Sequence, residues 1–219
     1  MQSVQKDLDP LHIAIDAALH RDETPLVLVR HGRTRANAEQ RFVGAMDIPL
    51  DELGLAQAGR VCSRLAALER EALYASPLSR AMQTAAPLGE PIQVPELAEL
   101  NQGAFEGRPA AEVIPEHPEI FAAWATDPTD VRVPGGETLR ELSQRVLPAL
   151  LDLGRRHTGP VLVFTHQMVL AVTVLSTLGL PFRFLRHVRQ PNTAVSVFGV
   201  RDEGLYLHRL NDHSHATVD

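Results

Sequence analysis

The sequence predicts an α/β fold, a three-layer α/β/α sandwich around a mostly parallel mixed sheet. Apolar runs of strand length, at 25–30 and 160–166, alternate with helical segments, as expected for parallel strands covered on both faces. Near the end of the chain, runs at 194–200 and 205–210 flank the turn sequence RDEG and predict an antiparallel hairpin. This hairpin makes the predicted sheet mixed.

Composition limits the possible functions. The 219 residues suit one domain, and the net charge of −6 lacks the basic footprint of a nucleic-acid-binding protein. The most apolar stretch, 161–180, is interrupted by Thr165, His166 and Gln167, so we expect no membrane span. The single cysteine, Cys62, allows no internal disulfide, and the N-terminus carries no signal-peptide pattern. We therefore expect a cytoplasmic protein.

Residues 1–24 are expected to form an N-terminal helical extension, followed by a domain at 25–212 and a C-terminal tail at 213–219. Asp9 is a candidate N-cap, with Pro10 at the first helical position. An apolar stripe follows on one face of this helix: Leu11, Ile15, Ala18 and Leu19. The stripe predicts packing on the chain's own domain or, alternatively, a contact in a homodimer.

The next elements alternate between helix and strand. A helix is expected at 55–69, with an apolar stripe that makes Cys62 a core residue: Leu55, Ala58, Val61, Cys62 and Leu65. A short strand at 72–76 follows. The pair Ser76-Pro77 then predicts a helix with serine as its cap and proline in its first turn.

The second half continues the pattern. A long helix is expected at 137–153, ending at Gly154, with a kink at Pro148. A buried helix at 168–178 follows the strand at 160–166. Two segments rich in proline and glycine, 87–95 and 107–136, are expected to be loops, and the second is long enough to be functional.

Two histidines stand where apolar strands end. His31 follows the run 25–30, His166 follows the second run, and Arg80 lies early in the helix after a third strand. The carboxyl ends of parallel strands meet at one edge of a sheet, so these side chains are expected to converge. Clustered guanidiniums recognise phosphate oxygens, and a histidine among them can attack phosphorus. The pattern therefore predicts transfer of a phosphoryl group onto His31.

The leaving alkoxide of such a reaction needs a proton donor. A carboxylic acid serves if burial raises its pKa. The segment ELAELNQGAFEGRP offers Glu96, Glu99 and Glu106, and spacing alone does not choose among them.

Several motifs, in one order along the chain, resemble the histidine phosphatase superfamily, in its phosphoglycerate mutase-like branch: RHGRTRAN at 30–37, NAEQRFVG at 37–44, SPLSRAMQTA at 76–85, LAELNQGAFEG at 97–107, PGGET at 134–138 and FTHQMV at 164–169. The resemblance implies that His31 is the phosphorylated nucleophile, that Glu99 is the proton donor and that His166 belongs to the catalytic set. It also implies a phosphate-binding shell of Arg30, Asn37, Arg80 and Gln167.

The sequence departs from the family pattern at two positions. Arg33 stands where an acidic or amide residue is common, and Gln167 stands where glycine is usual. Arg33, Gly44 and Gln102 are candidates for the leaving-group side of the site. The segment 102–133 supplies further candidates, Phe105, His117 and Trp124, of which Phe105 and Trp124 fit the core equally well.

The family includes both mutases and phosphatases. The segment 107–133 is short, and its arginines, Arg108 and Arg132, lie at its ends, so it looks too small to seal an acidic substrate from water. We therefore expect a phosphatase acting on a small phosphorylated metabolite. The alternatives are a cofactor-dependent phosphoglycerate mutase and a non-catalytic phosphate- or phosphopeptide-binding module. No metal or cofactor is expected, because the arginines supply the positive charge that a metal would bring.

Overall fold

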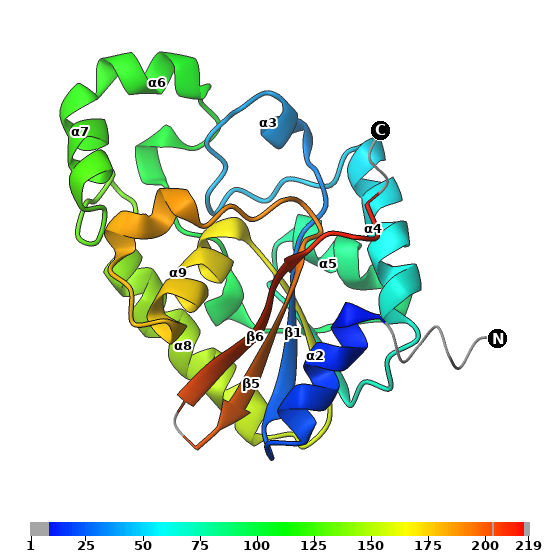
Figure 1. Cartoon of the computed structure of the whole chain (residues 1–219). Coiled ribbons are helices and arrows are strands. Elements are labelled where there is room, and N and C mark those ends of the chain that lie inside the picture. Colours follow the sequence, from blue (N-terminus) through cyan, green and yellow to red (C-terminus); the bar gives the residue numbers. More distant parts are fainter. Residues whose placement is uncertain (1–8, 203, 217–219) are drawn as a thin grey trace.

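The computed structural model describes residues 9–202 and 204–216, and it has the predicted three-layer α/β/α architecture (Figure 1). The six-stranded sheet has the order β3-β2-β4-β1-β5-β6. Strands β3, β2, β4 and β1 run parallel, whereas β5 is antiparallel to both β1 and β6. The sheet is therefore mixed, as predicted. Its strands are β1 (Thr24–Arg30), β2 (Ala72–Ala75), β3 (Ile92–Gln93), β4 (Val161–Thr165), β5 (Val195–Arg201) and β6 (Gly204–Asp212).

Each strand of the sheet centre is buried on both faces, because its side chains alternate between two cores. In β1, Leu26 and Leu28 pack into one core, while Val27 and Val29 pack into the other. The first core lies under helices α8 (Leu139–Arg155) and α9 (Gln167–Thr177). The second lies under α2 (Pro10–Leu19), α4 (Glu52–Leu65) and α5 (Ser79–Ala85). Burial on both faces explains why these strands appear as continuous apolar runs.

Helix α2 has the predicted cap. The Asp9 side chain accepts a hydrogen bond from the backbone N–H of Leu11, and Pro10 opens the helix. The helix packs on β1, β5 and β6 of its own chain. Leu19 does not belong to the buried face, since it is 39% exposed. Residues 1–8 of the predicted extension and 217–219 of the predicted tail lie outside the described residues.

Two helix starts differ from the prediction. Helix α4 begins at Glu52, capped by Asp51, and Leu55 is 53% exposed and not part of the buried stripe. Helix α5 begins at Ser79, so Ser76 is not its N-cap. The Ser76 hydroxyl instead lies 2.7 Å from Nε2 of His166. The long helix α8 begins after a capping box at Thr138.

The segment 107–136 is not one loop. It contains helices α6 (Ala110–Glu116) and α7 (Pro118–Thr126), which lie beyond the end of the sheet in Figure 1. Pro118 is the first residue of α7, a position that favours proline. The composition of segment 107–136 alone does not distinguish this role of proline from a role in a turn. Helices α6 and α7 contribute residues to a third small core with Phe42 and Phe105. The segment 87–95 likewise contains the short strand β3.

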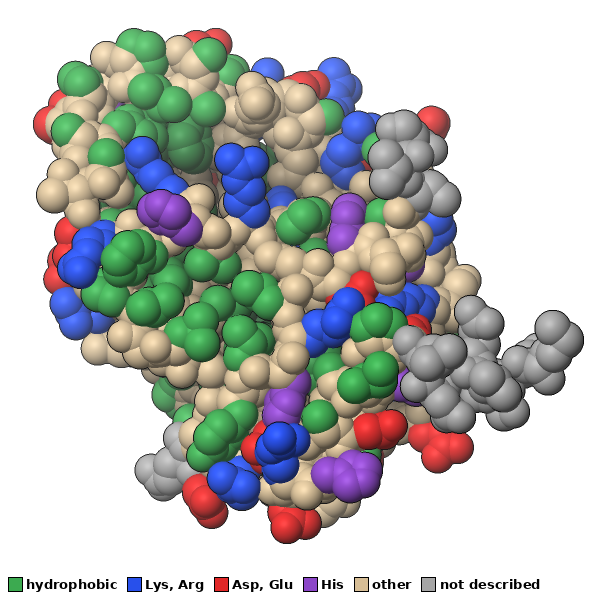
Figure 2. Space-filling model, viewed as in Figure 1, with side chains coloured by type: hydrophobic (Ala, Val, Ile, Leu, Met, Phe, Trp, Pro, Cys, Tyr) green, Lys and Arg blue, Asp and Glu red, His purple; other side chains and the backbone are tan. Residues whose placement is uncertain are grey.

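The remaining elements are short: α3 (Arg35–Ala38), η1 (Ala86–Leu88), η2 (Pro95–Leu97), η3 (Gly103–Phe105) and η4 (Phe182–His187). Exposed apolar side chains gather where α9 ends and over η4, on the face seen in Figure 2: Leu178, Leu180 and Phe184. Within the described ranges, no helix is both long and apolar enough to cross a membrane.

Candidate active site

The two strand-end histidines face each other because β1 and β4 are parallel neighbours. Arg30 pairs with Thr165 in the register, so His31 and His166 follow at the same level of the sheet. The backbone N–H of His31 donates to the carbonyl of Thr165 at 2.9 Å, and the two imidazole ring centres lie 5.2 Å apart. Both side chains are buried. The predicted convergence at the carboxyl ends of the strands is therefore present.

The surroundings of His31 fix its tautomer. Its Nδ1 lies 2.6 Å from the carbonyl oxygen of Gly32, a contact that requires the proton to reside on Nδ1. Burial, together with the charges of Arg30 and Arg80, holds the pKa of His31 well below its ordinary value. The imidazole is therefore neutral at physiological pH, and Nε2 keeps its lone pair.

Arg80 is fixed by three acceptors. Its guanidinium donates to the carbonyl oxygens of Gly44 and Met46, each at 2.8 Å, and to Nδ1 of His166 at 3.2 Å. An arginine has five N–H donors, so two remain for a ligand. Arg80 lies in the first turn of α5 and is 1% exposed. This burial makes Arg80 a rigid cation.

His166 supports Arg80 and does not line the cavity. Its Nδ1 accepts from Arg80, and its Nε2 lies 2.7 Å from the hydroxyl of Ser76, so the proton resides on Nε2. Burial and the charge of Arg80 hold the pKa of His166 well below its ordinary value. This neutral ring, with both nitrogens occupied, orients the guanidinium in front of it.

A polar cavity of about 120 Å³ lies at this end of the sheet. Its walls include most of the residues predicted for the nucleophile, the acid and the phosphate-binding shell: Arg30, His31, Asn37, Arg80, Glu99 and Gln167. Gln167 is the first residue of α9, so the positive end of that helix adjoins the cavity. An anion of phosphate size would therefore meet guanidiniums, an amide side chain and a helix N-terminus.

Arg30 and Asn37 each keep donors available. Nε of Arg30 is buried and has no hydrogen-bond partner among the described residues, while its NH1 donates to the carbonyl of Gln190. Burial lowers the pKa of Arg30 to about 10, which leaves the guanidinium charged at neutral pH. The side-chain oxygen of Asn37 accepts from the N–H of Thr34, which leaves the Asn37 amide donors free to face the cavity.

The structure distinguishes the three candidate acids. Glu99 lines the cavity, and burial raises the pKa of its carboxyl despite hydrogen bonds from the N–H groups of Leu100 and Met168. Glu96 is exposed on the surface. Glu106 does not line the cavity, and its carboxylate accepts from the N–H groups of Ala45 and Gln102. Glu99 is thus the buried acid that lines the same cavity as His31.

The leaving-group candidates divide into two groups. Gly44 and Gln102 line the cavity, but Arg33 does not; its Nε donates to Asp51 at 2.8 Å, which directs the side chain away from the site. Gly44 has a φ of +53°, and a Cβ there would lie 2.1 Å from a carboxylate oxygen of Glu106. Only glycine fits this position, where the chain passes close to the acid block.

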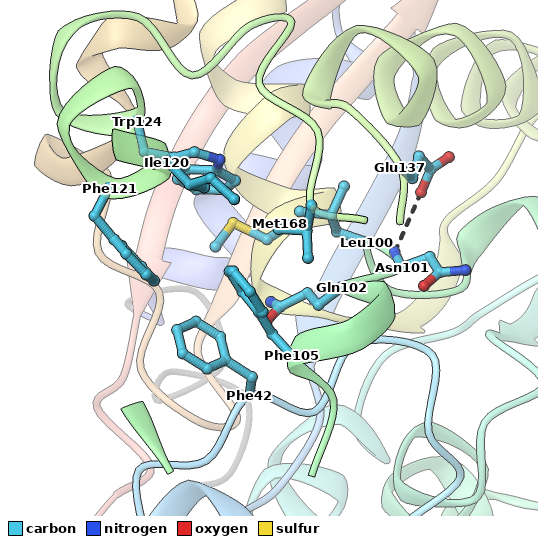
Figure 3. Close-up of a pocket in the computed structure, with 11 residues that line it drawn as sticks. Phe42, Leu100, Asn101, Gln102, Phe105, Ile120, Phe121, Trp124, Glu137 and Met168 are labelled. Atoms are coloured by element: carbon cyan, nitrogen blue, oxygen red, sulfur yellow. Dashed lines mark hydrogen bonds between the residues drawn. The ribbon is translucent and has the colours of Figure 1, made fainter. Parts of the chain in front are cut away.

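A narrow apolar pocket adjoins the cavity (Figure 3). Phe105 and Trp124 line it, as do Gln102, Phe42 and Met168, and the last three also line the polar cavity. The remaining predicted residue of this segment lies outside: the ring of His117 packs against Phe105, with ring centres 4.8 Å apart.

The cavity is also lined by Arg41, Phe42 and Met168, for which the sequence pattern alone predicts no role. Arg41 and Phe42 belong to the motif NAEQRFVG, and Met168 belongs to FTHQMV. The motifs mark these residues, but the sequence does not show which way their side chains point. Cys62 is buried as expected, where its thiol donates to the carbonyl of Thr84 and burial raises its pKa to about 12. Within 9–202 and 204–216, no group of three or more His, Cys, Asp or Glu side chains has the arrangement of a metal site.

Comparison with known proteins agrees with this geometry. The sequence profile of the histidine phosphatase superfamily (branch 1) matches residues 26–213. The chain therefore belongs to the histidine phosphatase superfamily, and its class is that of the phosphoric monoester hydrolases.

Individual relatives cover most of the chain. A metal-independent phosphoserine phosphatase of Arabidopsis thaliana is 33% identical over 91% of this chain and 86% of its own length. A probable phosphoglycerate mutase, GpmB, of Enterobacter sp. (strain 638) is 36% identical over 77% of this chain and 81% of its own. The solved structure of YhfR from Bacillus stearothermophilus superimposes with a TM-score of 0.82 at 31% identity, covering 88% of this chain and 98% of that one.

Proposed function

We propose that this protein hydrolyses a small phosphorylated metabolite through a phosphohistidine on His31, with Glu99 as the proton donor. The observation that carries the proposal is the tautomer of His31. The Gly32 carbonyl holds the proton on Nδ1, so Nε2 of His31 keeps its lone pair. His31 lines a cavity together with the buried Arg80 and the half-buried Arg30. A neutral, oriented imidazole among fixed cations suits attack on phosphorus.

In the first step, Nε2 of His31 forms a bond to phosphorus as the bond from phosphorus to the leaving oxygen breaks. The proton of the Glu99 carboxyl passes to that oxygen, so an alcohol departs and a carboxylate remains. The guanidiniums of Arg30 and Arg80 stabilise the charge spread over the other phosphoryl oxygens. The raised pKa of Glu99 supports this role, because it keeps the acid protonated nearer neutral pH.

In the second step, the Glu99 carboxylate takes a proton from a water molecule whose oxygen attacks phosphorus. The bond between phosphorus and Nε2 breaks, the electron pair returns to the imidazole, and inorganic phosphate is released. His166 takes part as a positioning residue, since it holds the Nε of Arg80 and does not line the cavity.

A phosphatase suits the surroundings better than a phosphoglycerate mutase. Glu137, the one charged residue among the described residues that line the apolar pocket, is already paired with Arg145. Inside this pocket a phosphoglycerate carboxylate would meet no cation from the described residues, and the nearby arginines, Arg183 and Arg186, line a separate groove. A binding module without catalysis is disfavoured as well, because phosphate recognition has no need of a buried acid such as Glu99.

Further expectations about location, assembly, domain bounds and partners belong to this proposal. The lone cysteine, buried in the core, is consistent with a reducing compartment and so with a cytoplasmic location. A homodimer stays a prediction, as does the boundary of the catalytic domain at 25–212. Nucleic acid and membranes are not expected as partners.

The test is phosphate release from a panel of phosphomonoesters, with phosphoglycerate mutase activity measured beside it. We expect phosphate release that saturates with substrate and is absent in His31→Ala. Interconversion of phosphoglycerates faster than phosphate release would contradict the proposal and favour the mutase.

A further inference from the structure

The apolar pocket beside the phosphate site contains two buried polar atoms that no other described residue pairs by a hydrogen bond. The pocket measures about 60 Å³ and is walled mainly by aromatic and aliphatic side chains: Phe42, Leu100, Phe105, Ile120, Phe121, Val133 and Met168. Trp124 and Gln102 also line it. The indole Nε1 of Trp124 and the carboxamide Oε1 of Gln102 are both buried, and neither has a hydrogen-bond partner among the described residues.

Such atoms are uncommon in a folded protein. Most buried polar groups are paired, and one left unpaired costs about 1–3 kcal/mol. Two in one small pocket, one a donor and one an acceptor, define a place that a ligand hydroxyl or an ordered water would complete. Figure 3 shows the indole nitrogen of Trp124 directed into the pocket and the Gln102 side chain among the residues that line it.

The position of the pocket identifies which part of a ligand it meets. Phe42, Gln102 and Met168 line both this pocket and the polar cavity that contains His31 and Glu99. A phosphate held in the polar cavity would therefore direct its alcohol past these shared residues, so that part of the alcohol enters the apolar pocket.

The walls of the pocket select against charge. Its one charged lining residue among those described, Glu137, is engaged by two N–H groups of Arg145 at 2.7 and 2.9 Å. Three phenylalanine rings, Phe42, Phe105 and Phe121, stand within 6.0 Å of one another, centre to centre, and form an apolar wall. A carboxylate or ammonium in this pocket would lose its hydration without gaining a counter-charge.

We propose that this pocket selects an uncharged, mainly apolar alcohol that carries a hydroxyl group, recognised by Trp124 as donor and Gln102 as acceptor. A hydroxyl satisfies both partners by itself, since it both donates and accepts. This inference rests on the proposed phosphatase function and names its substrate class. Trp124 and Gln102 are, on this view, specificity-determining residues.

The test compares four esters: phenyl phosphate, 3-hydroxyphenyl phosphate, phosphoserine and 3-phosphoglycerate. We expect kcat/KM to be highest for 3-hydroxyphenyl phosphate, about tenfold above phenyl phosphate for each hydrogen bond gained. Trp124→Phe and Gln102→Leu should each lower this ratio. The matched controls are Phe184→Leu and Gln93→Leu, at exposed positions outside the pocket, which should keep it.

Charged substrates provide the strongest contrary outcome. An adjoining groove is lined by Arg183 and Arg186, which offer cations for a carboxylate. If phosphoserine or 3-phosphoglycerate is hydrolysed faster than both aryl esters, the leaving group uses that groove and the proposal is wrong. Equal rates for the two aryl esters would also overturn it.

A binding measurement separates this inference from the proposed function. Trp124 is the single tryptophan of the chain, so its fluorescence reports directly on the pocket. In His31→Ala, titration with 3-hydroxyphenyl phosphate should change the emission, and adding Gln102→Leu should weaken binding about tenfold, whereas adding Gln93→Leu should not.

The two tests can fail separately. If no ester is hydrolysed and the titration still shows this preference, the proposed function fails and the assignment of the pocket stands. If esters are hydrolysed but emission does not change, or phenyl phosphate binds equally well, the assignment of the pocket fails.

Discussion

Replacing Glu99 by glutamine removes the proposed acid with little change in shape. The wild-type Oε1 accepts from the N–H groups of Leu100 at 2.9 Å and Met168 at 3.2 Å, and the glutamine oxygen can keep both bonds. What is lost is a proton donor, so the chemical step should slow while the fold persists. General acid catalysis contributes about 10²–10⁴-fold, which corresponds to about 2.7–5.4 kcal/mol of barrier.

The assay compares two leaving groups. With an alkyl phosphate, whose alkoxide leaves poorly without a proton, Glu99→Gln should lower kcat by about 10²–10⁴-fold. With p-nitrophenyl phosphate the loss should be far smaller, because that leaving group needs little protonation. Equal losses for the two substrates would mean that Glu99 does not donate a proton. If Glu106→Gln shows the selective loss instead, Glu106 is the acid and the assignment to Glu99 is wrong.

The same variant makes a stability prediction with a definite sign. Burial raises the pKa of Glu99 in the folded state, so the native protein binds more protons than the unfolded chain between pH 4.5 and that raised value. Stability from this group is present below pH 4.5 and is lost as the pH rises through the folded pKa. Denaturant titrations should show this loss in the wild type and its absence in Glu99→Gln; a parallel pH dependence in the two proteins would contradict it.

Three further predictions concern the phosphate site. Dialysis against a chelator should leave phosphate release unchanged, because Arg30 and Arg80 supply the positive charge; a loss that one added divalent ion reverses would refute this. Gly44→Ala should lower the thermal midpoint and the activity together, since its Cβ would meet Glu106 at 2.1 Å at a φ of +53°, and a wild-type melting curve would argue against the close approach. Arg80→Lys should weaken inhibition by inorganic phosphate by at least about tenfold, because lysine cannot span three protein acceptors and still present two donors; an unchanged inhibition constant would exclude this geometry.

The fold was predictable from sequence where burial is two-sided. Strands β1 and β4 are continuous apolar runs because both of their faces are covered, and that pattern needs no knowledge of partners. The segment with helices α6 and α7 was not predictable in the same way. The prolines of segment 107–136 predict a loop, although Pro118 starts a helix. The small core under α6 and α7 depends on Phe42, which is distant in sequence.

The candidate site, like the fold, was predictable from the sequence only in part. That His31, Arg80 and His166 converge follows from their places after parallel strands, and motif order supported Glu99 among three acids. The direction of each side chain depends on contacts that no local pattern encodes. Arg33 turns to Asp51, and Ser76 contacts His166 where a helix cap was expected. These details require the tertiary structure.

The most direct measurement of the central claim is chemical trapping of the intermediate. Rapid quench of the wild type with a ³²P-labelled substrate should yield a phosphoprotein that is labile in acid and stable in base, as phosphate on a histidine nitrogen is, and peptide mapping should place the label on His31. His31→Ala should yield none. A label that survives acid, or a label of equal yield in His31→Ala, would contradict the account.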